Sequence, residues 1–240
     1  MTSATTGPSR RERLRAATVA EILTTAHRLL VTDGPTAVTL RAISREMGMT
    51  APALYRYYPS LEDLMEHLRA QLSDECTAYI AAEMDKAGPV DSPGRLYQGA
   101  RAFRTWSKAH PIEFAEIFAA HEHGAGDGHP EDGPSHEAGM RFAAVFLNEF
   151  IALWQRQRFP IAEHVSEELR VQLQPFLDQF GVPLPVGALQ VFLSAWIRLY
   201  GAVALEIFGH LHFGIADVTP VFEAELADVA ARLGVEYQAP

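Results

Sequence analysis

The segment from Thr39 to Tyr58 places small residues directly ahead of aromatic and basic ones. Its second half carries a run of outward-facing residues: Thr50, Ala51, Ala53, Tyr55, Arg56 and Tyr57. Small side chains at the leading end of a helix allow that end to enter a major groove. Threonine, arginine and tyrosine side chains reach phosphates and base edges. The chemistry that this segment predicts is therefore contact with DNA.

The same segment has the spacing of a helix-turn-helix. Thr39 caps a short helix over residues 40–47, and Gly48 permits the positive φ of a tight turn. Thr50 is expected to cap a second short helix, with Pro52 in its first turn. Small Ser44 lets the helices approach, and apolar residues point inward: Leu40, Ile43, Met47 and Leu54. An ordinary helical hairpin would not require small outward residues beside exposed tyrosine and arginine.

Helical periodicity continues on both sides of this segment. Before it, apolar residues recur at helical spacing over residues 16–31 and stop at Asp33, Gly34 and Pro35. After it, the pattern predicts helices over residues 60–86, 93–109, 111–121, 135–158, 165–180, 186–210 and 217–233. No stretch alternates long enough for a sheet. The expected fold class is all-α, a three-helix helix-turn-helix domain followed by a helical domain.

Charge is distributed unevenly along the chain. The formal net charge is −10, but residues 1–60 hold eight arginines and four acidic residues, which gives this segment +4 and the remainder −14. A basic head approaches phosphates, whereas an acidic body does not. Many enzymes show such asymmetry by chance, so charge alone decides little.

Several classes of protein are disfavoured by composition. The longest apolar run, from Val191 to Phe208, contains Arg198 and Glu206, so we expect no membrane span. The N-terminus has no apolar stretch before a cleavage site, and the single cysteine, Cys76, excludes an internal disulfide framework. The expected location is the cytoplasm.

The helix-turn-helix segment resembles the DNA-binding domain of the TetR family of repressors. The resemblance covers residues 16–68 and rests on residues 39–44, on 47–49, on 54–60 and on Asp63 with Leu64. It implies three parts: a flexible basic arm over 1–15, a DNA-binding domain over 16–60, and a ligand-binding and dimerisation domain over 61–240. The function it implies is a repressor that binds an inverted-repeat operator as a dimer and is released by a small, largely apolar ligand.

The resemblance also assigns contacts at the DNA. It implies that Thr39 and Tyr55 contact phosphates, that Tyr57 touches the backbone or a base, and that four residues lie nearest the DNA: Arg41, Thr50, Ala51 and Pro52. Arg56 is added because it faces outward. The family usually has lysine at the position of Leu61, so that phosphate contact is missing here. Arginines of the arm, at positions 10, 11, 13 and 15, are candidates to replace it.

The body is rich in large rings at helical spacing. Most belong to a core, and some are candidates to line a cavity for an unidentified small-molecule effector: Phe103, Trp106, Phe118, Phe146, Phe150, Trp154, Trp196 and Tyr200. The last two helices, about 187–233, are the expected homodimer seam. Apolar residues recur there, and some are small enough to permit close approach: Ala195, Leu199, Gly201, Ala202, Val203, Ala204 and Leu205. Spacing does not decide which face is interfacial.

Two other functions are weighed against DNA binding. The His-rich loop over 121–136 contains His121, His123, His129 and His136, but it matches no common zinc spacing, so no metal and no cofactor are expected. No nucleophile with a base, phosphate-binding loop or paired carboxylates supports an enzyme, so no catalytic residue is assigned. A helical interaction module without DNA binding is the remaining alternative. The absence of the family's usual lysine at the position of Leu61 favours it slightly.

Overall fold

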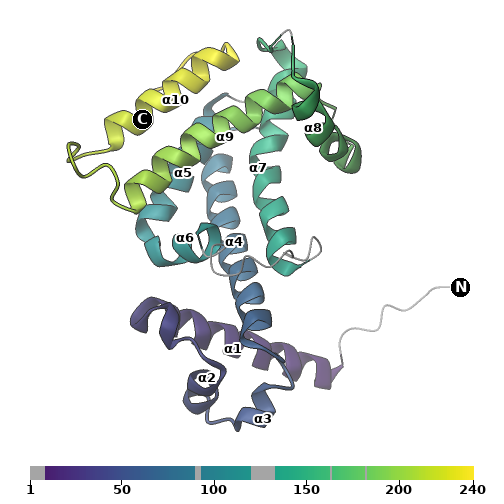
Figure 1. Ribbon diagram of the computed structural model, residues 1–240, viewed down its shortest axis with the longest axis vertical. Coiled ribbons are helices and arrows are strands. Elements are labelled where there is room, and N and C mark those ends of the chain that lie inside the picture. The colour runs from purple at the N-terminus through teal and green to yellow at the C-terminus, as the bar shows by residue number, and fades with distance from the viewer. Residues whose placement is uncertain (1–8, 90–92, 120–132, 163, 182) are drawn as a thin grey trace, which may run out of the picture. The chain divides into compact units, whose positions relative to one another are not determined.

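The computed structural model describes residues 9–89, 93–119, 133–162, 164–181 and 183–240. Within these ranges all regular elements are helices, which confirms the all-α prediction (Figure 1). In chain order they are α1 (Arg10–Asp33), the 3₁₀ turn η1 (Pro35–Ala37), α2 (Leu40–Glu46), α3 (Ala51–Leu54), α4 (Leu61–Lys86), α5 (Pro93–Ala109), α6 (Pro111–Phe118), α7 (Pro134–Gln157), α8 (Glu167–Phe180), α9 (Val186–Ile207) and α10 (Thr219–Leu233).

The chain divides into two compact units. The first comprises Met1–Ser73 and Ile112–Gly139, and the second Asp74–Pro111 and Met140–Pro240. This division differs from the predicted boundary at residue 60, because the start of α4 and all but the first residue of α6 pack with the helix-turn-helix. Helical periodicity identifies α6 but carries no information about its packing partner.

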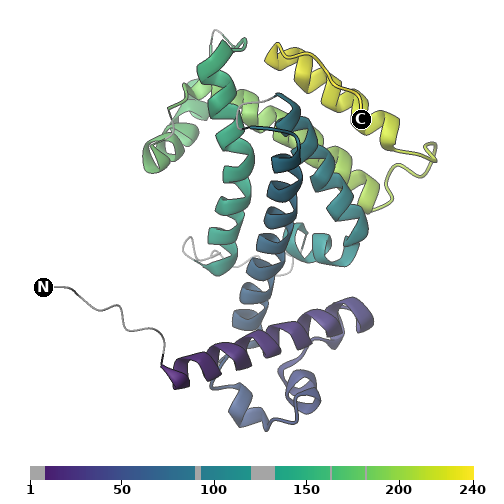
Figure 2. The ribbon, with the colours of Figure 1, turned by 180° about the vertical axis from the view of Figure 1, so that it is seen from behind.

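In the first unit, α1 lies across α2 and α3 (Figures 1 and 2). Its buried side supplies Ile22, Ala26 and Leu30, which are at most 1% exposed. The core of this unit also contains five fully buried residues from the other helices: Ile43 of α2, Leu54 of α3, and Leu64, Leu68 and Leu72 of α4. Burial of this apolar surface fixes the crossing of the two short helices.

The flexible basic arm predicted over residues 1–15 is wrong for residues 10–15, because these residues are helical. Helix α1 begins at Arg10, because Ser9 accepts a hydrogen bond from the Glu12 amide while the Glu12 carboxylate accepts one from the Ser9 amide, at 3.2 and 2.6 Å. This reciprocal capping box starts a helix well ahead of the first core residue. Residues 1–8 lie outside the described residues.

The second unit is a helical body in which α9 lies beside α10 (Figure 1). Its core gathers residues from α7, α8, α9 and α10, and the most buried of them are Leu153, Ala188, Leu189, Val191 and Leu233. By length and mean hydropathy α9 could cross a membrane, the one such helix in the described part of the chain. Six of its residues belong to this core, and Glu206 pairs with Arg104, so we interpret α9 as a core helix.

Candidate functional site

The turn between α2 and α3 has the geometry that the sequence predicts. Thr39 caps α2 by accepting a hydrogen bond from the Ala42 amide at 3.1 Å. Gly48 has a φ of 64°, and the next amide, of Met49, donates to the Ser44 carbonyl at 2.8 Å. A side chain at Gly48 would be strained at that φ. Ser44 is buried, which confirms its expected place between the two helices.

The predicted DNA-contacting residues lie between positions 39 and 57, and none of them is fully buried. Thr39, Arg41, Thr50, Pro52, Tyr55 and Arg56 are exposed, and Ala51 and Tyr57 are half-buried. Helix α3 is shorter than predicted, because it ends at Leu54 and places Tyr55, Arg56 and Tyr57 in the turn that follows. The expected cap by the Thr50 side chain is also wrong: its hydroxyl makes no capping hydrogen bond.

A basic groove lies between the start of α1 and the turn after α3. It has a volume of about 650 Å³ and is lined by Arg10, Arg11, Leu14, Arg15, Thr18, Arg56 and Tyr57. The Arg15 guanidinium lies 5.0 Å from the centre of the Tyr57 ring, within the range of a cation–π contact. The capping box that makes residues 10–15 helical therefore also directs Arg15 onto a predicted DNA-contacting residue.

The arginines of this groove are not neutralised by carboxylates. Within the described chain, Arg10, Arg11, Arg15 and Arg56 form no ion pair, and neither does Arg41 at the start of α2. Arg28, on another part of α1, does pair with Glu46. A guanidinium without a carboxylate partner exchanges small counterions for phosphates when DNA binds. The local charge is thus suited to a polyanion.

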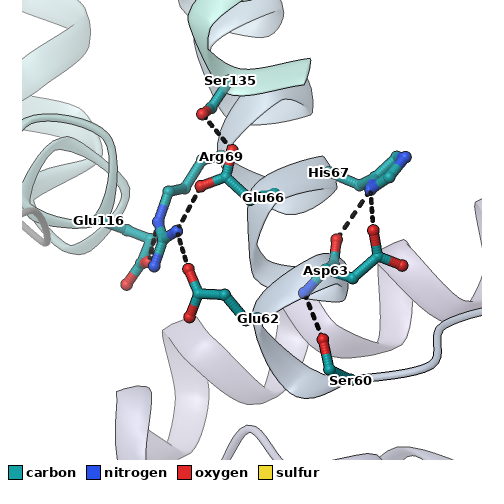
Figure 3. Close-up of polar contacts among 8 residues, drawn as sticks. All are labelled: Ser60, Glu62, Asp63, Glu66, His67, Arg69, Glu116 and Ser135. Carbon is teal, nitrogen blue, oxygen red and sulfur yellow. Dashed lines mark hydrogen bonds and ion pairs between the residues drawn. The ribbon is translucent and has the colours of Figure 1, made fainter. Parts of the chain in front are cut away.

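Helix α4 follows this surface and begins with a polar cap. Ser60 accepts a hydrogen bond from the Asp63 amide at 3.0 Å, and the Asp63 carbonyl lies 2.8 Å from Nδ1 of His67 one turn later (Figure 3). The His67 ring packs edge-on against Tyr58, with centroids 5.3 Å apart. These contacts hold the end of the turn that carries Tyr55 and Arg56.

Arg69 of α4 is the centre of a carboxylate cluster in the first unit. Its guanidinium donates to Glu66 and Glu116, each at 2.9 Å, and to Glu62 at 3.3 Å (Figure 3). Ser135 of α7 donates to Glu66 from the opposite side. Burial raises the pKa of the Glu116 carboxyl, an effect that Arg69 opposes. The cluster joins α6 to α4.

Helix α6 is also joined to α1. Glu113, one turn before Glu116, lies 3.1 Å from Nε2 of His27. Two carboxylates spaced one turn apart on α6 thus reach two different helices of the first unit. Sequence reasoning missed both, because an acidic residue on an amphipathic helix is usually solvated.

An apolar cavity lies inside the second unit, between α5, α7, α9 and α10. Four of the predicted ligand residues line it: Phe103, Phe146, Phe150 and Trp196. The remaining lining is also aliphatic or aromatic and comes from Leu96, Tyr97, Ala100, Phe192, Ala195, Leu199, Leu226, Val229, Ala230, Leu233 and Val235. Its volume of about 50 Å³ is below the roughly 300–1,000 Å³ of small-molecule pockets.

The other predicted ligand residues lie outside this cavity. Phe118 is part of the first unit and packs against Phe114, with ring centroids 5.0 Å apart. Trp106 stacks on His110, Trp154 packs against Phe159, and Tyr200 stacks on the back of Trp196. Helical spacing selects buried rings, but it does not distinguish a cavity wall from solid core.

Two further predictions can be compared with the structure. In the expected dimer seam, Ala195, Ala202 and Val203 are buried within their own unit, so the opposite side of α9 is the exposed one. In the His-rich loop, His121, His123 and His129 lie outside the described residues. His136, the fourth histidine, is exposed.

The comparisons with known proteins agree with this geometry. Residues 22–68 match the family described as bacterial regulatory proteins, tetR family, and residues 96–229 match the tetracyclin repressor-like C-terminal domain. The second match alone spans more than half of the chain. The protein therefore belongs to the TetR family, and it is a DNA-binding transcriptional regulator of the helix-turn-helix type rather than an enzyme.

Individual relatives extend over nearly the whole chain. The HTH-type transcriptional regulators Mb1846 of Mycobacterium bovis and Rv1816 of Mycobacterium tuberculosis are each 24% identical over 222 residues, covering 89% of this chain and 91% of theirs. A solved structure, the putative regulatory protein SCO4313, is 28% identical with a TM-score of 0.69, covering 93% of this chain and all of that one. A putative tetR family transcription regulator from Shewanella sp. PV-4, at 18% identity and a TM-score of 0.55, shares the fold; the match covers 88% of this chain and 95% of that one.

Proposed function

We propose that this regulator is a repressor that binds an inverted-repeat operator as a homodimer in the cytoplasm and is released by a small, largely apolar ligand. The observation that carries the DNA part is the groove beside the turn after α3, where Arg10, Arg11, Arg15 and Arg56 lie without carboxylate partners. Regions that bind a polyanion keep such groups exposed, whereas structural arginines are paired.

The proposed contacts at the DNA divide into two kinds. Thr50, Ala51 and Pro52 at the start of α3 enter the major groove, because they are small and precede bulkier residues. Thr39, Arg41, Tyr55 and Tyr57 contact the backbone on either side, and Arg56 reaches a phosphate or a base edge. The first kind selects sequence, and the second supplies affinity.

The homodimer is proposed to form on the exposed side of α9. Ile197, Gly201, Leu205 and Phe208 follow one another at helical spacing, and the three side chains are 67%, 42% and 41% exposed. A Cβ at Gly201 would meet no atom of the described residues within 4 Å, so packing against them does not require glycine there. An apolar stripe with a small residue at its centre suits close approach by a second copy.

The effector is proposed to act through α5 and α6. Helix α5 lines the cavity, and α6 begins after one intervening residue, so a shift of α5 is passed to α6. Glu113 and Glu116 of α6 then displace α1 and α4 through His27 and Arg69. A ligand releases DNA only if it binds the displaced form more tightly than the DNA-binding form.

The proposal is tested first by selecting bound sequences from a random duplex pool with the purified protein at low salt, with and without cell extract. Enrichment of one inverted repeat is expected, with loss of enrichment when an extract supplies the effector. A folded dimer that enriches nothing would instead support an interaction module without DNA binding.

The dimer is tested separately. Ile197→Asp places a carboxylate on the exposed stripe and is expected to give a folded monomer by analytical ultracentrifugation. Val171→Asp, at a position 63% exposed on α8, is the matched control and should remain a dimer. A dimeric Ile197→Asp variant would place the interface elsewhere.

A further inference from the structure

The C-terminal residues 235–238 pass along the edge of the apolar cavity after α10 has ended. Gly234 ends that helix with a φ of 65°, and the Val235 amide donates back to the Ala230 carbonyl at 3.1 Å. This hydrogen bond reverses the chain and turns Val235 into the cavity lining. Both ribbon views place the C-terminus beside α10 (Figures 1 and 2).

Polar contacts hold this segment to α5 and α10. The Tyr97 hydroxyl donates to the Glu236 carbonyl at 2.8 Å, and Arg101 donates to the Gln238 carbonyl at 2.6 Å. Arg101 also forms a bidentate pair with Glu223 of α10, at 3.0 and 2.8 Å. The Tyr237 hydroxyl donates to that same carboxylate at 2.6 Å. The segment is therefore fastened at three successive residues, although it has no helical hydrogen bonds of its own.

The cavity behind this segment is apolar and only partly enclosed. No charged side chain occurs among its lining residues, and the Tyr97 hydroxyl is already used by Glu236. A charged ligand would lose its hydration there without gaining a partner. A ligand of ordinary size needs more room than about 50 Å³, so some part of the wall must move aside. The other walls are formed by side chains of α5, α7, α9 and α10, which are held by helical hydrogen bonds.

We propose that residues 235–238 form a strap that gates this cavity, and that the ligand admitted is an uncharged aromatic or aliphatic molecule that enters when the strap detaches from Tyr97 and Arg101. This inference rests on the proposed function only in taking the cavity as the effector site. Detachment exchanges hydrogen bonds within the protein for hydrogen bonds to water, so its free-energy cost is modest compared with opening a helical wall.

The test uses a matched pair of fluorescent probes with the full-length protein and no DNA. N-phenyl-1-naphthylamine is uncharged, and 8-anilino-1-naphthalenesulfonate has the same rings with one added sulfonate. The uncharged probe is expected to bind and the sulfonate to bind at least about tenfold more weakly, because no cation lines the cavity. Ala100→Phe and, at a half-buried lining position, Leu199→Phe fill the cavity and should abolish binding of the uncharged probe.

The gate is tested by stopped-flow kinetics with the uncharged probe. Tyr97→Phe removes one hydrogen bond to the strap and is expected to raise the association rate about fivefold. Arg101→Met removes the hydrogen bond to Gln238 and also the ion pair that positions Glu223 for Tyr237. It should raise the rate about tenfold or more, as should ending the chain at Val235. Arg232→Met is the control: that exposed arginine of α10 bonds to Ser194 and not to the strap. Thermal unfolding confirms that each variant is folded.

The outcomes separate the strap from the proposed function. Equal association rates in wild type, Tyr97→Phe and Arg101→Met would show that the ligand enters elsewhere. Equal binding of the sulfonate, blocked by the filling variants, would overturn the uncharged class, and so would absence of binding by the uncharged probe. If the kinetics follow the prediction but a bound probe leaves operator affinity unchanged, the strap stands and the proposed release of DNA by ligand at this cavity fails.

Discussion

Arginines are used differently in the two units. In the second unit, four arginines each donate to a carboxylate of another helix: Arg95, Arg101, Arg104 and Arg198. Arg101 and Arg104 do so through both Nε and Nη2. Around the helix-turn-helix, the arginines of the basic groove form no ion pair with any described residue. Net charge is therefore a poor guide to where this protein meets DNA, because pairing decides which charges are available.

The contrast has a physical reason. A bidentate arginine–carboxylate pair fixes the distance between two helices and uses two of the five N–H donors of the guanidinium. An arginine in such a pair cannot contact a phosphate without breaking it. Arginines of the second unit thus hold its helices together, whereas arginines of the basic groove keep a positive charge that is available to phosphates.

The largest expected effect follows from Tyr55→Ala combined with Arg56→Ala. Operator affinity should fall at least about 100-fold, because a backbone contact and a basic contact are lost together. The measurement is fluorescence anisotropy with the selected operator at fixed salt, and sedimentation checks that the dimer persists. Operator binding that survives both substitutions would refute the assignment of the recognition surface.

Replacing the groove arginines together, as Arg10→Ala, Arg11→Ala and Arg15→Ala, should weaken binding about 10- to 100-fold. Up to three phosphate contacts per subunit disappear, or six per dimer, so the slope of log affinity against log salt should become less steep by up to about five. Arg13→Ala is the control, since Arg13 is exposed on the same helix but does not line the groove. An unchanged slope in the triple variant would mean that the groove does not contact DNA.

Arg104→Met tests the opposite side of the comparison. Glu206 would lose a bidentate partner at 2.6 and 2.7 Å and keep only Lys108, so the free energy of unfolding should fall by about 2 kcal/mol. Urea denaturation measures this loss, and the salt dependence of operator binding should stay as in wild type. Arg198→Met, which breaks more exposed pairs, should cost less than about 1 kcal/mol.

The smallest effect concerns pH. Burial opposes ionisation of Glu206, but hydrogen bonds from Arg104 and Lys108 outweigh it and lower the pKa of this carboxyl. For Glu223 burial is likewise outweighed, by Arg101 and Tyr237, so its pKa is also lowered. Lowered folded-state values stabilise the body above the unfolded pKa of about 4.3, and this stability is lost as pH falls through the folded values. Urea midpoints between pH 7 and pH 3 should show the decline, with a shallower decline in Arg104→Met.

Much of the helix-turn-helix could be predicted from residue order. The Thr39 cap, the positive φ at Gly48 and the buried position of Ser44 depend on neighbours within a few residues. Apolar periodicity places the start of α1 at residue 16, six residues too late, although the capping box at Ser9 is also local. The reason is that Arg10 to Ala16 are exposed and take no part in the apolar pattern. Half of the predicted ligand residues lie outside the apolar cavity, because rings in a solid core have the same helical spacing as rings in a cavity wall.

The sequence by itself determined an all-helical chain and the two short helices with their tight turn. It also determined that residues 1–60 are basic and that the rest of the chain is acidic. Those properties follow from backbone preferences and hydrogen bonds between near neighbours. Only the tertiary structure decided that Arg15 lies over Tyr57, that Glu113 and Glu116 join α6 to the first unit, and that Tyr97 meets Glu236. Such contacts join residues that are far apart in the chain. Which residues meet depends on how the buried faces of the helices pack, and the local sequence pattern does not encode that packing.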